Sequence, residues 1–189
     1  MTTIRMRIEA GQTLTQSMKD MPDLFPPFYL LMIRAGEVGG ILEITLGQVA
    51  DMLQEDWTLS QMVGIPPMLM AKEEERTDWN TLPIPQRTLH LLLFCKTFGS
   101  MLSSGVPILQ AMEVAGESLF AQQRNEVLAA REKVLEHGSI AEIVAQMPFL
   151  PPSAQALFSI GMEHGELDTL SLKAAELYRH QLVYQRQAG

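Results

Sequence analysis

The sequence predicts an all-α protein built from short antiparallel helices. Gly and Pro recur at short spacing along the 189 residues, and between them the apolar residues fall three and four positions apart, which is the period of amphipathic helices. The alternating pattern of a half-buried strand is almost absent. Because 47% of the residues are apolar, the chain has enough material for a packed core.

Residues 1–57 contain the first group of predicted helices. Thr13 and Gln16 form a capping box at the start of one helix. A second helix runs from Pro27 to the glycine-rich stretch GEVGGIL, and a third covers Ile41 to Trp57. The third helix carries an apolar stripe on one face, so we expect that face to pack on another surface: Leu42, Leu46, Val49, Ala50, Leu53 and Trp57.

Residues 58–86 are predicted to be a connector. Four prolines, Pro66, Pro67, Pro83 and Pro85, interrupt any long helix there. The charge run KEEER at residues 72–76 also favours irregular structure, although a short helix within the connector remains open.

Residues 87–186 predict a complete domain of six helices with clear start and stop signals. In SSGVP, Gly105 ends one helix and Pro107 opens the next. Ser139 and Glu142 form a second capping box. The predicted helices are 87–103, 107–118, 122–136, a short one from 139 to the Met-Pro pair at 147–148, 152–161 and 167–186.

The two groups of helices read as an internal repeat. When Gly36 is placed over Gly161, Pro27 lies over Pro152 and the apolar stripes of the two last helices coincide, except that Leu46 lies over Ser171. The glycine corners then match at these positions: Gly36, Gly40 and Leu42 over Gly161, Gly165 and Leu167. Glu37 lies over Met162, so a catalytic glutamate common to both copies is not supported.

These motifs resemble the F-domain family of type II secretion and type IV pilus assembly, the inner-membrane platform proteins. The resemblance lies in FCKTFGSMLSSGVPILQAMEVAGES and in the two corners GEVGGIL and GMEHGEL. It implies a complete second domain at 87–186, an incomplete first domain at 1–57 that holds only the last three helices, and a 58–86 linker. It also implies contacts with the chain itself, with a cytosolic assembly ATPase and with other inner-membrane components.

The resemblance further implies that a transmembrane helix follows each domain and that the domains lie at the cytoplasmic face of the inner membrane. No stretch here has the roughly 18 uncharged apolar residues that such a helix needs, so the chain as written is expected to be cytoplasmic or peripheral. A truncated or divergent relative, a soluble fragment and a mispredicted reading frame all fit this pattern.

Charge and cysteine content exclude several classes of function. The net charge of −8 repels phosphate backbones, so we expect no nucleic-acid partner. The single Cys95 lies in an apolar run, which predicts burial and rules out a disulfide or a cysteine zinc site within one chain.

The sequence predicts no catalytic residue and no cofactor. The corner at Gly36 follows a helix and is not followed by Lys and Ser or Thr, unlike a phosphate-binding loop. Glu37 is expected near the N-terminus of the following helix, where the helix dipole favours an acid. A weaker hypothesis is a divalent-cation site at the second corner, with Glu163, His164, Glu166 and Asp168 as candidate ligands.

The favoured function is therefore a non-enzymatic assembly or scaffold component. Because the stripe from Leu42 to Trp57 lacks front helices of its own to cover it, we expect dimerisation or packing of the two halves. Two alternatives remain open: a metal-binding helical-bundle enzyme with Glu163, His164 and Glu166 as ligands, and a decayed fragment without function.

Overall fold

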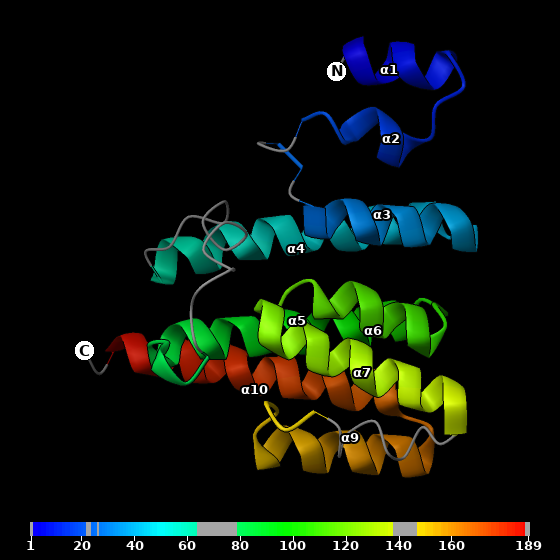
Figure 1. Ribbon diagram of the computed structural model, residues 1–189. Helices are drawn as coiled ribbons and strands as arrows, with labels where there is room; N and C mark the ends of the chain where they lie inside the picture. Colours follow the sequence, from blue (N-terminus) through cyan, green and yellow to red (C-terminus); the bar gives the residue numbers. More distant parts are fainter. Residues whose placement is uncertain (1, 22–23, 26, 64–78, 138–146, 188–189) are drawn as a thin grey trace. The chain divides into compact units, whose positions relative to one another are not determined.

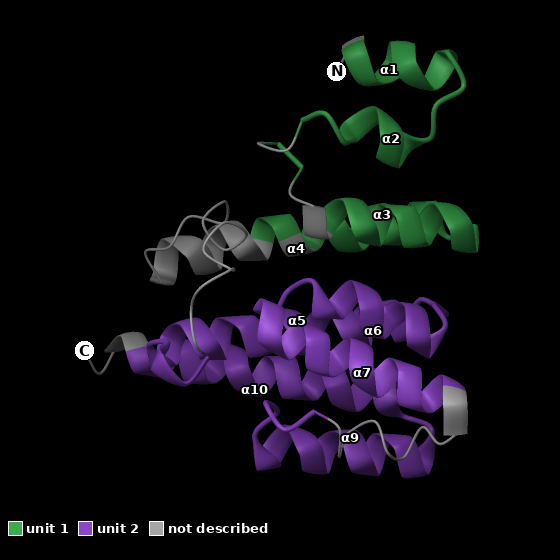
Figure 2. Cartoon of the chain, viewed as in Figure 1, with its two compact units in different colours: residues 1–72 green, residues 73–189 purple. Residues whose placement is uncertain are grey.

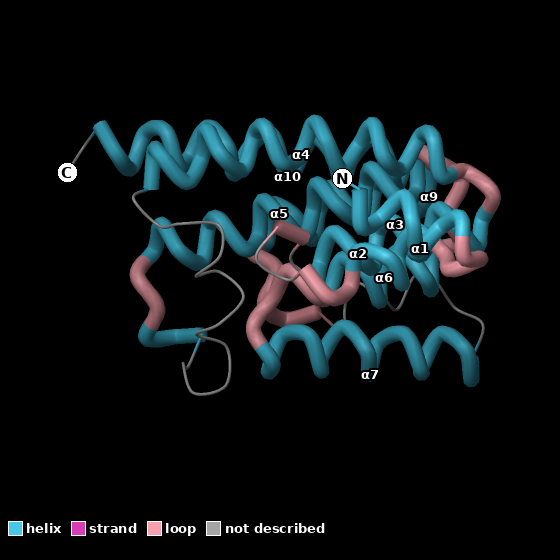
Figure 3. Tube along the Cα trace, turned by 90° about the horizontal axis from the view of Figure 1, so that it is seen from above, coloured by secondary structure: helices cyan, strands magenta, loops and turns pink. Residues whose placement is uncertain are grey.

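The protein is all-α, as predicted. The computed structural model describes residues 2–21, 24–25, 27–63, 79–137 and 147–187. Within these ranges the regular elements are nine α-helices and one 3₁₀ turn, joined by loops (Figure 1, Figure 3). The chain divides into two compact units, residues 1–72 (unit 1) and 73–189 (unit 2) (Figure 2).

Unit 1 contains four described helices: α1 (Thr2–Glu9), α2 (Leu14–Met18), α3 (Pro27–Gly39) and α4 (Leu42–Val63). The predicted capping box at the start of α2 is present, since the Thr13 hydroxyl accepts a hydrogen bond from the backbone N–H of Gln16, and the Gln16 side chain accepts one from the Thr13 N–H. Among the described residues of unit 1, helix α3 contributes most of the buried apolar side chains: Tyr29, Leu30, Met32, Ile33 and Ala35.

Helix α1 was not predicted from the sequence. Its apolar residues Met6 and Ile8 are exposed, so no amphipathic stripe marks this segment as a helix. Helix α4 also extends six residues beyond the predicted end at Trp57, into the predicted connector.

Unit 2 contains a 3₁₀ turn η2 (Trp79–Thr81), followed by α5 (Ile84–Ser103), α6 (Ile108–Gly116), α7 (Ala121–His137), α9 (Pro152–His164) and α10 (Leu167–Gln187). Helix α5 begins three residues before the predicted Arg87 because Pro85 lies in its first turn, where a proline costs no intrahelical hydrogen bond. The predicted helix that starts at Ser139 lies outside the described residues.

Helices α5 and α10 form the central pair of unit 2 and lie side by side along much of their length (Figure 1). Helix α9 packs on α10, α6 packs on α5, and α7 packs on α6. Stacked aromatic rings fill the interior: Phe98 lies 6.0 Å from Phe94 and 5.8 Å from Phe158 between ring centroids. Cys95 is fully buried in the same region, as predicted.

Candidate functional site

The glycine corner between α3 and α4 reverses the chain with a left-handed glycine. Gly40 has φ of +69°, a conformation that residues with a side chain rarely adopt. The Ile41 N–H donates to the Gly36 carbonyl at 2.9 Å, and the Gly40 N–H donates to the Glu37 carbonyl. These two bonds satisfy carbonyl groups that the end of a helix leaves without partners.

The corner between α9 and α10 has nearly the same backbone geometry. Gly165 has φ of +72°, and the Glu166 N–H donates to the Gly161 carbonyl at 2.8 Å. The matched glycines Gly40 and Gly165 therefore have the same structural role, and so do the acceptors Gly36 and Gly161. The two corners thus share a local backbone geometry, and the internal repeat as a whole stays a prediction from the sequence.

The first glycine of each corner also allows a close approach of two helices. A Cβ atom on Gly36 would lie 2.5 Å from the Thr45 hydroxyl oxygen, and a Cβ on Gly161 would lie 2.8 Å from the Leu167 Cα. Neither distance is tolerable for a carbon atom, so any larger residue would push the helices apart.

Glu37 does cap a helix, but that helix is α2 and not α4, so the expected position at the start of α4 was wrong. Its carboxylate accepts hydrogen bonds from the Leu14 N–H at 2.6 Å and from the Thr15 hydroxyl at 2.6 Å, with longer contacts to the Thr15 N–H at 3.4 Å. These donors belong to the first turn of α2, which precedes α3 in the chain. The carboxylate thus ties α3 to α2 and satisfies amide groups that the helix itself leaves unpaired.

A shallow surface pocket of about 440 Å³ surrounds this contact. Besides Glu37 and residues of α2, its lining includes the basic side chains Lys19 and Arg34 and the exposed Val38. Since the Glu37 oxygens are occupied by the amide and hydroxyl of α2, the acid has a structural role here.

The candidate cation ligands of the second corner do not converge. Glu163, His164 and Glu166 are exposed, and the His164 Nδ1 lies 2.9 Å from the Ile160 carbonyl of its own helix. The Asp168 carboxylate accepts a hydrogen bond from the neighbouring Thr169 hydroxyl. Across the described part of the chain, no group of three His, Cys, Asp or Glu side chains is arranged to hold a metal ion.

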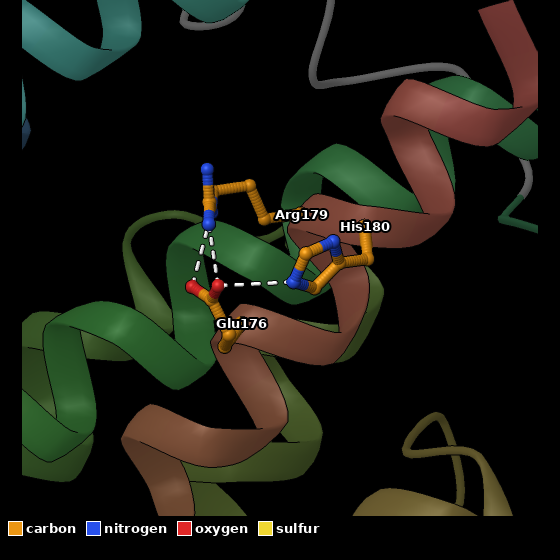
Figure 4. Close-up of polar contacts among 3 residues, drawn as sticks. All are labelled: Glu176, Arg179 and His180. Atoms are coloured by element: carbon orange, nitrogen blue, oxygen red, sulfur yellow. Dashed lines mark hydrogen bonds and ion pairs between the residues drawn. The ribbon is translucent and has the colours of Figure 1, made fainter. Parts of the chain in front are cut away.

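A charged cluster on the exposed side of α10 was not singled out from the sequence (Figure 4). Arg179 donates two hydrogen bonds to the Glu176 carboxylate, one of them from Nε at 3.0 Å, and the His180 Nε2 lies 3.1 Å from the same group. The hydrogen bond from Arg179 is the main cause that lowers the pKa of Glu176. The spacing of three and four residues on a helix could have indicated these pairs.

Helices long and apolar enough to cross a membrane are not found among the described residues. The longest, α4, is interrupted by acidic residues.

Known proteins similar to this chain come from two related machines. The family model for the type II secretion system protein F matches residues 1–63 and 94–188. A type II secretion system protein F of Vibrio cholerae is 23% identical over 250 residues, which cover 92% of this chain and 62% of that protein. A type IV pilus assembly protein PilC of Myxococcus xanthus is 22% identical over 252 residues, covering 93% and 60%.

A second PilC, from Thermus thermophilus, is 34% identical over 94 residues, which cover 47% of this chain and 22% of that protein. The chain spans about three fifths of the length of the Vibrio and Myxococcus relatives.

Proposed function

Since the chain belongs to the type II secretion system protein F family, we propose that it is a non-enzymatic scaffold component of a type II secretion or type IV pilus assembly machine. The observation that carries this proposal is the match of one family model to both parts of the chain. Residues 1–63 belong to unit 1, and residues 94–188 belong to unit 2.

The domain organisation is part of the proposal. Residues 87–186 form a complete F-type domain of six helices, residues 1–57 form an incomplete copy, and residues 58–86 link them. The matching geometry at Gly40 and Gly165 supports a common origin of the two helix corners. The two corners share glycines but not an acid, because Met162 stands at the position that matches Glu37. The role of the corner is therefore structural: it holds two helices together.

The scaffold works through helix surfaces that contact other components at the cytoplasmic face of the inner membrane. We propose the assembly ATPase as one partner and further copies of the chain as another. Exposed apolar side chains occur in both units, Val38 and Leu24 in unit 1 and Tyr184 and Ile84 in unit 2, and such residues are available for helix-to-helix contacts.

Binding of the purified chain to the assembly ATPase that the same genome encodes tests this function. We expect saturable binding by biolayer interferometry, and no binding to an unrelated hexameric ATPase from the same organism as a control. Equal signals for the two ATPases, or none, would remove the ATPase from the proposal.

Light scattering over a range of chain concentrations tests self-association separately. A mass that rises with concentration supports it. A monomer at every concentration removes the self-contact but leaves the ATPase contact standing.

A further inference from the structure

A pocket of about 290 Å³ lies within unit 2 and is lined by residues of that unit. Four segments that are distant in the sequence contribute to it: the 3₁₀ turn η2, the first two turns of α5, the loop before α9 and the second half of α10. The glycine corners and the charged cluster of α10 lie outside it. Small-molecule pockets usually enclose about 300–1,000 Å³, so this pocket suits a group of the size of one or two amino-acid residues.

One wall of the pocket is apolar and held in place by ring contacts. Trp79, Leu91 and Phe149 line it, and all three are buried. The rings of Trp79 and Phe149 meet edge to face with 6.4 Å between centroids, and Phe149 meets Phe94 in the same way at 5.5 Å. The wall is thus anchored to the aromatic interior of unit 2, and it favours an apolar group on a ligand.

Arg87 brings a positive charge to the same pocket. The side chain is half-buried, and no carboxylate in the described part of the chain forms an ion pair with it. Helix α5 contains no acidic residue, and the lining residues of α10 are neutral: Tyr178, Gln181 and Gln185. A guanidinium that has lost part of its hydration gains most from a planar carboxylate, which accepts two parallel hydrogen bonds. The pocket therefore favours a carboxylate on the ligand.

The Gln185 amide leaves a hydrogen-bond acceptor unused. Its nitrogen donates to the Thr88 hydroxyl oxygen at 3.5 Å, the limit of hydrogen-bond distance. The Thr88 hydroxyl donates to the Ile84 carbonyl at 2.8 Å, so it cannot also donate to the amide oxygen. The Gln185 Oε1 is buried and has no hydrogen-bond partner among the described residues. An N–H group on a ligand would supply the missing donor.

These three features are found together in the last residue of a polypeptide when that residue is apolar. Its side chain, its carboxylate and its backbone N–H all belong to one residue. An internal Asp or Glu carries the carboxylate without the apolar side chain, and a fatty acid lacks the N–H.

We propose that this pocket binds the C-terminus of a partner protein that ends in an apolar residue. The carboxylate binds Arg87, the terminal N–H donates to Gln185, and the side chain packs on Trp79 and Phe149. The inference rests on the proposed scaffold function and adds to it the chemistry of one partner contact.

Trp79 provides a fluorescent reporter in the wall of the pocket. The sequence contains two tryptophans, so Trp57→Phe in the full chain leaves Trp79 as the single one. The probe is an acetylated Gly-Ser-Gly-Leu peptide with a free C-terminal carboxylate, and its matched control is the same peptide with a C-terminal amide. We expect a saturable change in Trp79 emission with the peptide acid. The amide should bind at least about tenfold more weakly, because it carries no charge to pair with Arg87.

Two further probes test the other parts of the ligand. A peptide acid that ends in glycine should bind more weakly than the leucine peptide, because it leaves the apolar wall without a partner. Octanoate has a carboxylate and an apolar body but no N–H, and it should also bind more weakly than the leucine peptide.

Substitutions of Arg87 test the charge. Arg87→Gln should weaken the peptide acid about tenfold or more, whereas Arg87→Lys should have a smaller effect, because lysine keeps the charge and loses the paired hydrogen bonds. The matched control Arg179→Gln removes the same charge from an exposed position of α10 outside the pocket, and it should leave binding unchanged. Circular dichroism checks that each variant is folded, and the comparison of peptide acid with peptide amide needs no Arg87 variant.

Equal binding of the peptide acid and the amide, or binding that survives Arg87→Gln, would overturn the proposal. So would the absence of saturable binding to the folded chain in both Trp79 emission and calorimetry. Octanoate that binds as tightly as the leucine peptide would also overturn it, and would assign the pocket to a small apolar carboxylic acid. A chain that binds the peptide acid but not the ATPase keeps this inference and loses the ATPase contact, and the reverse result loses only this inference.

Discussion

The Glu37 carboxylate accepts a hydrogen bond from the backbone N–H of Leu14 at 2.6 Å, although the two residues lie 23 positions apart in the chain. This contact converts the acid of the family corner into a cap for a neighbouring helix. In the second copy Met162 stands at the matching position, so the cap belongs to unit 1.

Glu37→Ala should destabilise unit 1. The substitution leaves the first-turn amides of α2 and the Thr15 hydroxyl without their acceptor, which costs about 1–2 kcal/mol in the free energy of unfolding. Urea denaturation measures the change. The control Glu163→Ala removes an exposed acid at the second corner and should alter stability by less than about 0.5 kcal/mol. Equal effects of the two substitutions would contradict the capping role.

Glycine substitutions should act in opposite directions at two sites. Gly161→Ala places a Cβ atom 2.8 Å from the Leu167 Cα, and we expect a loss of about 1–3 kcal/mol. Gly47→Ala in α4 meets no atom within 4 Å and should stabilise the chain by about 0.5–1 kcal/mol, because alanine favours the helix. Thermal unfolding of both variants decides the matter, and a destabilising Gly47→Ala would show that α4 is already covered at this position.

Acidification should destabilise unit 2 through His90. The ring is buried against Phe120, with Nδ1 2.6 Å from the Ser118 carbonyl, and burial lowers the pKa of His90 below 6.5 despite this hydrogen bond. The unfolded chain then binds a proton at a pH where the folded chain does not. Stability is therefore complete above about pH 6.5 and falls as the pH drops below that value.

Urea midpoints between pH 7.5 and 5.5 test the effect of His90. The His90→Gln variant should show a flatter pH dependence over this range, whereas His164→Gln, at an exposed position, should keep the slope of the unaltered chain. A slope that survives His90→Gln would mean that another group controls the acid response.

Cys95 should be unreactive until the protein unfolds. Burial raises the pKa of its thiol above the ordinary range, so the nucleophilic thiolate is scarce and sheltered in the native state. A chromogenic disulfide reagent at pH 8 should label the native chain only slowly and the urea-unfolded chain at once. Rapid labelling of the native protein would show that the interior around Phe94 and Phe98 opens readily.

Local patterns in the sequence were enough to predict the helices and their corners. The fold class, the capping box at Thr13 and the corner glycines depend on residues three to five positions apart, and such spacings are readable directly. The helix ends differ more from the prediction. The prolines of the connector predict an interruption at Pro85, but a proline in the first turn is compatible with a helix that starts at Ile84.

Contacts between distant residues needed the tertiary structure. Periodicity identifies an acid at the end of α3, but the donor that meets it is 23 residues away and depends on how α2 packs on α3. The same limit applies to the stripe of α4. The sequence marks Leu46, Val49 and Leu53 as one apolar face, whereas packing on α3 buries Val49 and leaves the two leucines exposed.

The sequence by itself thus determined an all-helical chain with two matching glycine corners, because helix period, caps and left-handed glycines are local properties. The tertiary structure decided that Glu37 caps α2, and that Leu46 and Leu53 of α4 are exposed while Ser171 and Tyr178, at the matching positions of α10, are buried. Both depend on which helix lies against which, and that choice is made by packing energies between segments far apart in the chain.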